Sequence, residues 1–150
     1  MRNIYLAGPF FNEQQIALEE QVYEQLKQNE TVNQIFRPCK HQDQNAFDSE
    51  PWRRNTFLSD INQIRMCDII VAIVDFLEVD GEVIPDPGTV WELGFGYALG
   101  KPLVLVNAQN YQKINLMLER SYTKAVLLDE LATLDFINLR PDLTRPLECI

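Results

Sequence analysis

The chain has 150 residues, of which 46% are hydrophobic and 23% charged, and its formal net charge at pH 7 is −9. This length and composition fit one folded domain over residues 1–150 and argue against a disordered chain. The acidic balance disfavours a nucleic-acid polymer or an anionic membrane as a partner, because no basic patch would release counterions from phosphates. We therefore expect a small-molecule ligand.

The sequence has neither membrane nor secretion signals. No apolar run approaches the roughly 18 residues that span a bilayer, and the start of the chain lacks the apolar region of a signal peptide. Its three cysteines, Cys39, Cys67 and Cys149, are odd in number and far apart. They predict neither a disulfide framework nor a zinc site, and they favour a reducing, cytoplasmic location.

The first half of the chain alternates apolar strands with amphipathic helices. Leu18, Val22 and Leu26 recur at spacing four in a segment without Gly or Pro, which predicts a helix. Gly8-Pro9 marks a turn after the first strand. The expected elements are a strand over 3–7, a helix over 13–29, a strand over 32–36, a loop over 39–51 and a helix over 52–67.

The second half continues this alternation. The β-branched run over 69–74 is typical of a strand buried on both faces. Asp86 as N-cap and Pro87 at the first helical position predict a helix start, and Gly100 predicts its end. The expected elements are a strand over 69–74, an acidic loop over 75–85, a helix over 87–99, a strand over 102–106, a helix over 114–120, a strand over 125–128 and an irregular tail after 138.

This order of elements predicts the fold class. Strands that alternate with helices form right-handed βαβ units, which build a parallel sheet with helices on both faces. We expect an α/β, doubly wound sheet of about five strands. Ligands of such sheets bind beyond the carboxyl ends of the strands, so the site should lie among the loops that follow Ala7, Phe36, Val74 and Val106.

Glu92 is the most informative residue. It is the only charged side chain between Pro87 and Gly100, and a helix that is apolar nearly all round is a buried one. A lone carboxylate there is costly unless it is paired or hydrogen-bonded, and the nearby helix start favours its ionised form. We interpret Glu92 as a nucleophile or base at the mouth of a pocket. The alternative is a structural carboxylate that caps neighbouring backbone.

Asp60 lies within the apolar stripe of its expected helix rather than opposite it. A second inward-facing carboxylate could share a pocket with Glu92, one of the two staying ionised while the other carries a proton. The alternative is an ion pair with Arg53 or Arg54. The single histidine, His41, lies in a polar loop, and we expect it to be solvated.

Asp86 and Tyr5 each have a simpler, structural interpretation. Asp86 is by default only the N-cap of the expected helix. Tyr5 lies in the first expected strand, where a phenol more often packs in the core than contacts a ligand. The sequence holds no phosphate-binding loop and no dinucleotide motif, which argues against a P-loop ATPase or a dinucleotide enzyme.

Five segments, in this order along the chain, carry a family resemblance. They are I-Y-L-A-G-P-F-F from Ile4, W-R-x-x-T-x-x-x-D from Trp52, C-D-I-I-V-A-I-V from Cys67, D-P-G-T-V-W-E-L-G-F-G-Y-A from Asp86 and I-N-L-M from Ile114. With them the chain resembles the nucleoside 2-deoxyribosyltransferase family. The D-x-G-x-x-x-E-x-G block and the late N-L-M are the most specific part jointly.

The resemblance implies a flavodoxin-like, cytoplasmic enzyme of nucleoside salvage, usually a hexamer, that exchanges the base of a 2′-deoxynucleoside without cofactor or metal. It implies that Glu92 is the catalytic nucleophile and that Tyr5 orients it. Asp60 and Asp86 match the acidic residues that contact base and sugar and help to protonate the departing base. Its implied partners are deoxynucleosides and free purine or pyrimidine bases.

The resemblance also implies a set of substrate-binding residues. Gln42 matches a base-contacting glutamine, although Gln44 fits nearly as well, and Asn115 matches an asparagine that holds a sugar hydroxyl in the neighbouring subunit's site. Family members often end in an aromatic residue that serves the adjacent site, whereas this chain ends in Ile150. The full expected set is Gln42, Phe10, Phe11, Trp52, Gly88, Asn115 and Met117.

The chemistry fits these residue types. Cleavage of an N-glycosidic bond passes through an oxocarbenium-like state, which a carboxylate can both stabilise and bond to. A covalent deoxyribosyl intermediate on Glu92 that an incoming base attacks gives transfer with retention.

Three other functions remain open. A hydrolase of deoxynucleoside 5′-monophosphates would need a phosphate site, but the turn after the first strand is apolar and the loop near Asp86 acidic. A receiver-like module would need an acidic pair for magnesium where Gly8-Pro9 stands. A plain nucleoside-binding protein would not explain Glu92.

Overall fold

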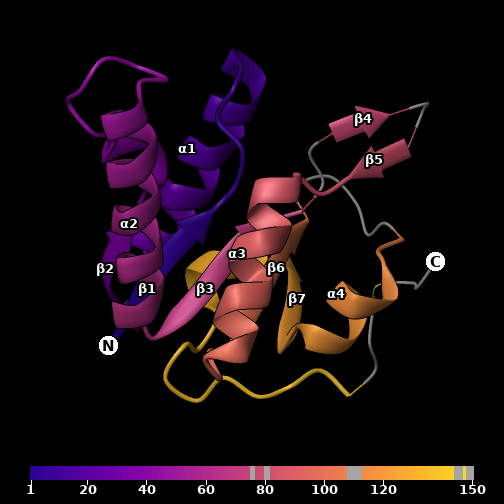
Figure 1. The fold of residues 1–150 in the computed structure, drawn as a ribbon. Coiled ribbons are helices and arrows are strands. Elements are labelled where there is room, and N and C mark those ends of the chain that lie inside the picture. Colours follow the sequence, from indigo (N-terminus) through magenta and orange to yellow (C-terminus); the bar gives the residue numbers. More distant parts are fainter. Residues whose placement is uncertain (75–76, 80–81, 108–112, 144–146, 148–150) are drawn as a thin grey trace.

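The computed structural model describes residues 1–74, 77–79, 82–107, 113–143 and 147. Five strands form one all-parallel sheet in the order β2-β1-β3-β6-β7 (Figure 1). This is the flavodoxin-like strand order, and it confirms the predicted fold class. The strands are β1 (Arg2–Ala7), β2 (Val32–Phe36), β3 (Ile69–Ile73), β6 (Leu103–Asn107) and β7 (Lys124–Leu127).

Helices cover both faces of this sheet (Figure 1). One face packs against α1 and the 3₁₀ turn η2, and the other against α2, α3 and α4. The helical elements are α1 (Glu13–Lys27), η1 (Pro38–Lys40), α2 (Glu50–Met66), α3 (Pro87–Ala98), α4 (Leu116–Ser121) and η2 (Leu128–Thr133). No helix in the described part of the chain is long and apolar enough to cross a bilayer.

The alternation of side chains along β1 decides what reaches the site. Ile4 and Leu6 enter the core beneath α1, whereas Tyr5 and Ala7 enter the core beneath α2 and α3. β3 is buried along its whole length, because it lies in the middle of a sheet that is covered on both faces. The Tyr5 side chain therefore lies on the same face of the sheet as α3.

Several predicted boundaries move by a few residues, and each shift has a local cause. The helix expected from Trp52 begins at Glu50, because the Ser49 hydroxyl accepts a hydrogen bond from Trp52 N at 3.3 Å and Pro51 fits the first turn. The helix expected from Ile114 begins at Leu116, because Asn115 is its N-cap. The sequence analysis missed η1 and η2, which are too short to show a periodic pattern.

The expectation of a loop over 75–85 is wrong in part. Two short strands, β4 (Leu77–Val79) and β5 (Glu82–Ile84), pair antiparallel there. The acidic residues of this segment obscured an alternation with period two, which is the pattern of a hairpin. Residues 75–76 and 80–81 lie outside the described residues. Residues 148–150, whose role in an adjacent site the family resemblance raised, lie outside them as well.

The expectation that α3 is buried all round is also wrong. Leu93 and Gly96 face the sheet, and a Cβ at position 96 would overlap the Ile70 side chain. Trp91 and Tyr97, by contrast, are 50% and 58% exposed. The outer side of α3 is therefore apolar but exposed to solvent. For this reason the composition of the helix predicts more burial than the structure shows.

Candidate active site

Glu92 and Tyr5 form the centre of the site. The Tyr5 hydroxyl, carried by β1 and fully buried, donates a hydrogen bond of 2.5 Å to Glu92 Oε1 on α3. Tyr5 reaches the carboxylate because α3 packs over the sheet face onto which Tyr5 projects. The phenol is thus more than core filling, since its hydroxyl has a carboxyl partner.

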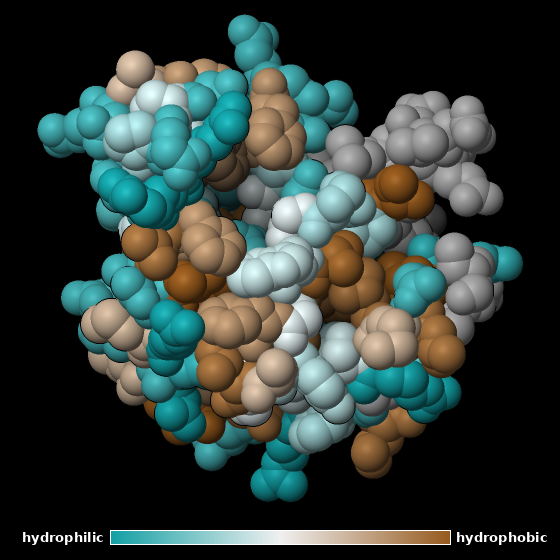
Figure 2. Space-filling view, in the orientation of Figure 1, coloured by the Kyte–Doolittle hydropathy of each residue, from teal (hydrophilic) through white to brown (hydrophobic). Residues whose placement is uncertain are grey.

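A cavity of about 350 Å³ lies between α2 and α3 and contains both inward-facing carboxyl groups. Figure 2 shows the surface hollowed between these two helices, with apolar side chains around the hollow. The structure thus brings Asp60 and Glu92 together. The residues that line the cavity are Phe57, Asp60, Ile61, Ile64, Gly88, Trp91 and Glu92.

Burial dominates the ionisation of Glu92. Loss of solvent raises the pKa of its carboxyl to about 7, the hydrogen bond from Tyr5 lowers it, and the charges of Asp60 and Asp86 raise it further. The expectation that the helix start keeps Glu92 ionised is therefore wrong in its net direction. The Glu92 carboxyl is therefore partly protonated near neutral pH.

Asp60 responds in the same way but more weakly. Burial raises the pKa of its carboxyl to about 6, and the charge of His41 lowers it. The proposed pairing with Arg53 is wrong, because Arg53 binds Asp48 at 2.9 Å. Burial and the nearby charges of Glu92 and Asp60 raise the pKa of Tyr5, so its hydroxyl stays a hydrogen-bond donor.

Asp86 caps α3, as the sequence predicts. Its carboxylate accepts hydrogen bonds from Thr89 N at 2.9 Å and Thr89 Oγ1 at 3.3 Å, and it is almost fully buried. A Cβ at Gly88 would lie 3.0 Å from Asp86 Oδ2, so glycine leaves that oxygen room at the cavity wall. A direct catalytic role of Asp86 stays a prediction.

The remaining base-binding candidates lie outside this cavity. Gln42 donates a hydrogen bond of 2.8 Å to Pro38 O, and Gln44 is exposed. Phe10 and Phe11 stack on each other at 5.8 Å between ring centroids, and Trp52 packs against Phe47 at 4.8 Å. Their contacts with a substrate stay predictions.

Asn115 and Met117 lie on the other side of α3. They line a second, largely apolar cavity of about 610 Å³, to which α3 contributes Val90, Gly94 and Tyr97. At 100° per residue these three positions face away from Glu92. Asn115 of one chain therefore does not face the Glu92 of the same chain.

Sequence reasoning missed several residues near the site. His41 is exposed, as expected, but sequence reasoning missed that its ring stacks on Phe36 at 4.5 Å and that its Nδ1 lies 2.8 Å from Arg37 O. Phe57 and Trp91, which line the cavity, contact each other at 5.6 Å. Nothing in the sequence marked these three residues, because an aromatic residue in a helix more often fills a core and a histidine in a polar loop is more often solvated.

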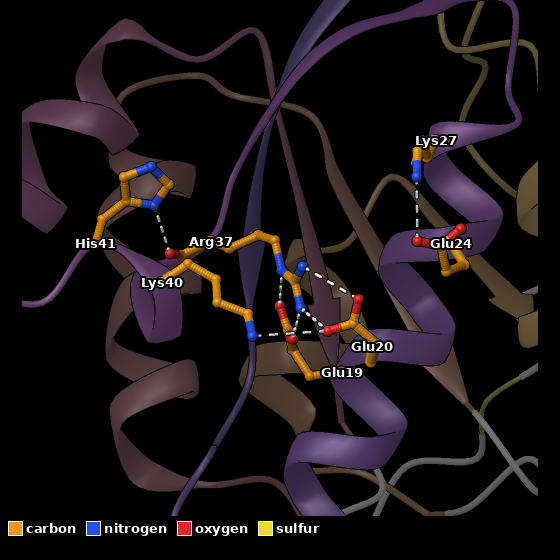
Figure 3. Close-up of polar contacts among 7 residues, drawn as sticks. All are labelled: Glu19, Glu20, Glu24, Lys27, Arg37, Lys40 and His41. Carbon is orange, nitrogen blue, oxygen red and sulfur yellow. Dashed lines mark hydrogen bonds and ion pairs between the residues drawn. The ribbon is translucent and has the colours of Figure 1, made fainter.

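A charged cluster anchors the segment that precedes His41 (Figure 3). Arg37 binds both carboxylate oxygens of Glu19 on α1, with Nε–Oε1 at 2.8 Å and Nη2–Oε2 at 2.5 Å, and it also binds Glu20 at 2.6 Å. The guanidinium lies over the Tyr23 ring at 4.0 Å. This pairing fixes the end of β2 against α1.

Comparison with known proteins gives a family match and related structures. The family model for nucleoside 2-deoxyribosyltransferase matches residues 4–127. A nucleoside deoxyribosyltransferase of Limosilactobacillus fermentum is 32% identical over 156 aligned residues, which cover 95% of this chain and 89% of that protein.

Solved structures agree in fold. A 2-deoxyribosyltransferase of Bacillus psychrosaccharolyticus is 34% identical with a TM-score of 0.75, covering 94% of this chain and 99% of that one. The 2-desoxiribosyltransferase of Leishmania mexicana is 30% identical with a TM-score of 0.53, covering 75% and 68%. A conserved protein of Enterococcus faecalis V583, 21% identical with a TM-score of 0.65 over 87% and 97%, shares the fold.

Proposed function

Because the chain belongs to the nucleoside 2-deoxyribosyltransferase family, we propose that it moves the 2-deoxyribosyl group of a deoxynucleoside from one base to another through a covalent bond to Glu92. The observation that carries this proposal is the pairing of Glu92 with the Tyr5 hydroxyl at 2.5 Å, in a cavity that also contains Asp60. A carboxylate, a donor that holds it and a second acid are the groups that the reaction requires.

In the first half-reaction the Glu92 carboxylate attacks the anomeric carbon as the N-glycosidic bond breaks. The base leaves with the bonding electron pair and takes the proton of the Asp60 carboxylic acid. In the second half-reaction a nitrogen of the incoming base attacks the same carbon, the bond to Glu92 breaks, and the proton of the incoming base returns to Asp60. Two displacements at one carbon give net retention.

The carboxyl groups of Glu92 and Asp60 are suited to these proton transfers. Burial raises both pKa values, to about 7 and about 6, so the pair can share a single proton near neutral pH. A base nitrogen that accepts a hydrogen bond from Asp60 would draw this proton to Asp60 and leave Glu92 ionised. Phe57 and Trp91 give the cavity apolar walls, and a bound substrate that covers them would exclude water and favour transfer over hydrolysis.

A second copy of the chain completes the site in this proposal. Asn115 and Met117 lie on the α4 side of α3, away from the Glu92 of their own chain, and Met117 is 76% exposed. Trp91 and Tyr97 extend this exposed apolar surface along α3, and surfaces of this kind commonly mark protein interfaces. The homo-oligomer places Asn115 in a neighbour's site, where its amide holds a sugar hydroxyl.

Base exchange tests the proposal directly. Incubation of the protein with thymidine and free adenine should yield deoxyadenosine and thymine, measured by chromatography. Glu92→Ala should abolish the product, and Glu92→Gln, which keeps the size of the side chain, should do so as well. Release of thymine without deoxyadenosine, or turnover of deoxynucleoside 5′-monophosphates alone, would overturn transfer in favour of hydrolysis.

A further inference from the structure

Three aromatic rings form a stack that leads from the surface to Glu92. Tyr5 and Phe36 lie directly opposite each other on the paired strands β1 and β2, with ring centroids 5.6 Å apart and planes inclined by 19°. His41 covers Phe36 from its other side at 4.5 Å, with planes inclined by 25°. Because β2 is the edge strand of the sheet, no further strand supports Phe36 there.

His41 stands between this stack and an open groove. The groove has a volume of about 440 Å³, runs between β2 and the end of α2, and is lined by both Phe36 and His41. Gln34 and Gln63 make its wall partly polar, so water can fill it. Removal of the His41 ring would widen this groove and uncover more of the outer face of Phe36.

The His41 ring is held in its position from below (Figure 3). Its Nδ1–H donates to Arg37 O at 2.8 Å, because a carbonyl can only accept. Arg37 is in turn fixed by its two-point pairing with the buried Glu19. The ring orientation is thus set by the anchored end of β2 rather than by solvent.

We propose that His41 is a positioning residue of the Glu92 site. Its ring covers the outer side of Phe36, and Phe36 holds the Tyr5 phenol at the distance from which it donates to Glu92. His41 does not itself line the Glu92 cavity, although its charge acts on Asp60 there. The positioning effect of its ring passes through the two intervening rings. The inference rests on the proposed function for its effect on rate, although the Tyr5–Glu92 bond itself does not depend on any activity.

Two substitutions separate the ring of His41 from its hydrogen bond. His41→Ala removes both, whereas His41→Phe keeps a ring over Phe36 and loses only the donor to Arg37. We expect His41→Ala to lower kcat for base exchange roughly 10- to 100-fold, the size of a misplaced catalytic group, with KM nearly unchanged. His41→Phe should restore most of the rate. Asn45→Ala, which removes an amide bonded only within the same loop, is the matched control.

A spectroscopic readout tests the same inference without activity. A hydrogen bond as short as that of Tyr5 to Glu92 should give a downfield proton resonance protected from solvent exchange, assigned by its loss in Tyr5→Phe. We expect His41→Ala to broaden or abolish this resonance and His41→Phe to keep it. Thermal unfolding of each variant verifies that it is folded.

The outcomes distinguish the two proposals. If the wild type exchanges bases while His41→Ala keeps both the resonance and kcat, or raises only KM, the positioning role is overturned and the proposed function stands. If the resonance is lost in His41→Ala while the wild type shows no base exchange, the positioning role holds and the proposed function fails.

Discussion

Burial raises the pKa of the Glu92 carboxyl to about 7, whereas a glutamate in an unfolded chain titrates near 4.3. The folded protein therefore binds the proton more tightly than the unfolded chain does. Between these two pH values, each increase in pH lowers the free energy of unfolding. The side chain that the proposed reaction needs thus weakens the fold at neutral and alkaline pH.

Glu92→Gln should consequently be more stable than the wild type at pH 8. The amide cannot ionise, so it avoids the cost of a buried charge while keeping the hydrogen bond from Tyr5. We expect a gain of about 1–3 kcal/mol in the free energy of unfolding at pH 8, shrinking toward pH 5. Urea denaturation at both pH values measures it. If the variant were less stable than the wild type at pH 8, the ionised Glu92 carboxylate would not weaken the fold.

Asp60→Asn should separate acid catalysis from the attack by Glu92. Loss of a positioned general acid should lower the rate of thymidine cleavage roughly 10²- to 10⁴-fold. With 7-methyl-2′-deoxyguanosine, whose cationic base departs without taking a proton, the loss should be far smaller. Initial rates with the two substrates provide the comparison. Equal losses with both would show that Asp60 does not protonate the leaving base.

At the scale of the elements, α1 and β2 are joined by a buried ion pair. The side chains of Arg37 and Glu19 are 8% and 3% exposed, so neither charge is well solvated on its own (Figure 3). Removal of one partner of such a pair leaves a buried charge without compensation. The pair therefore couples the position of α1 to the end of β2 and to the turn η1 that follows it.

Arg37→Met should destabilise the protein by about 3–5 kcal/mol, because it leaves the Glu19 carboxylate buried and unpaired by the guanidinium. Adding Glu19→Gln to this variant should recover part of the loss, since the remaining charge is then removed. Chemical denaturation of the wild type, the two single variants and the double variant closes the cycle. Additive losses would mean that the two side chains are not coupled.

The elements with a regular pattern could be predicted from the sequence, and those defined by contacts could not. The run of mostly β-branched residues in β3 and the cap of α3 allowed both elements to be predicted correctly, because burial on both faces and N-capping leave local signals. The hairpin of β4 and β5 was obscured by charge. The stack of His41 on Phe36 depends on how η1 folds back, for which no local pattern exists.

The residues of the site likewise differ in whether the sequence could predict them. Glu92 and Asp60 stood out because each is a carboxylate in an apolar stripe, and the structure places both in one cavity. Phe57 and Trp91 gave no such signal, because aromatic residues in a helix more often fill a core. Asn115 was predicted only through the family resemblance, since its proposed role depends on a second chain.

For the whole molecule, the exposed apolar surface along α3 and α4 leads to the proposed homo-oligomer. The cavities on the two sides of α3 hold different parts of the expected site, with Glu92 on one side and Asn115 on the other. Because the helix separates them, one chain alone cannot bring the two side chains together around a single sugar without a rearrangement. An assembly can.

Mixing two inactive variants tests this arrangement. Glu92→Gln lacks the nucleophile and Asn115→Ala lacks the donated amide, so each should show strongly reduced base exchange alone. Subunit exchange between them should create sites that combine an intact Glu92 with an intact Asn115, and activity should reappear. Sedimentation measures the assembly in parallel. A mixture no more active than its components, despite hybrid formation, would contradict a shared site.

The proposed mechanism depends on a covalent bond between Glu92 and the sugar. Rapid quenching of the protein with a deoxynucleoside in the absence of acceptor base, followed by proteolysis and mass spectrometry, measures it most directly. We predict that the peptide containing Glu92 gains the mass of one deoxyribosyl group and loses it again when adenine is added before the quench. Efficient base exchange with this peptide unmodified, or with the sugar attached to another residue, would contradict a covalent intermediate on Glu92.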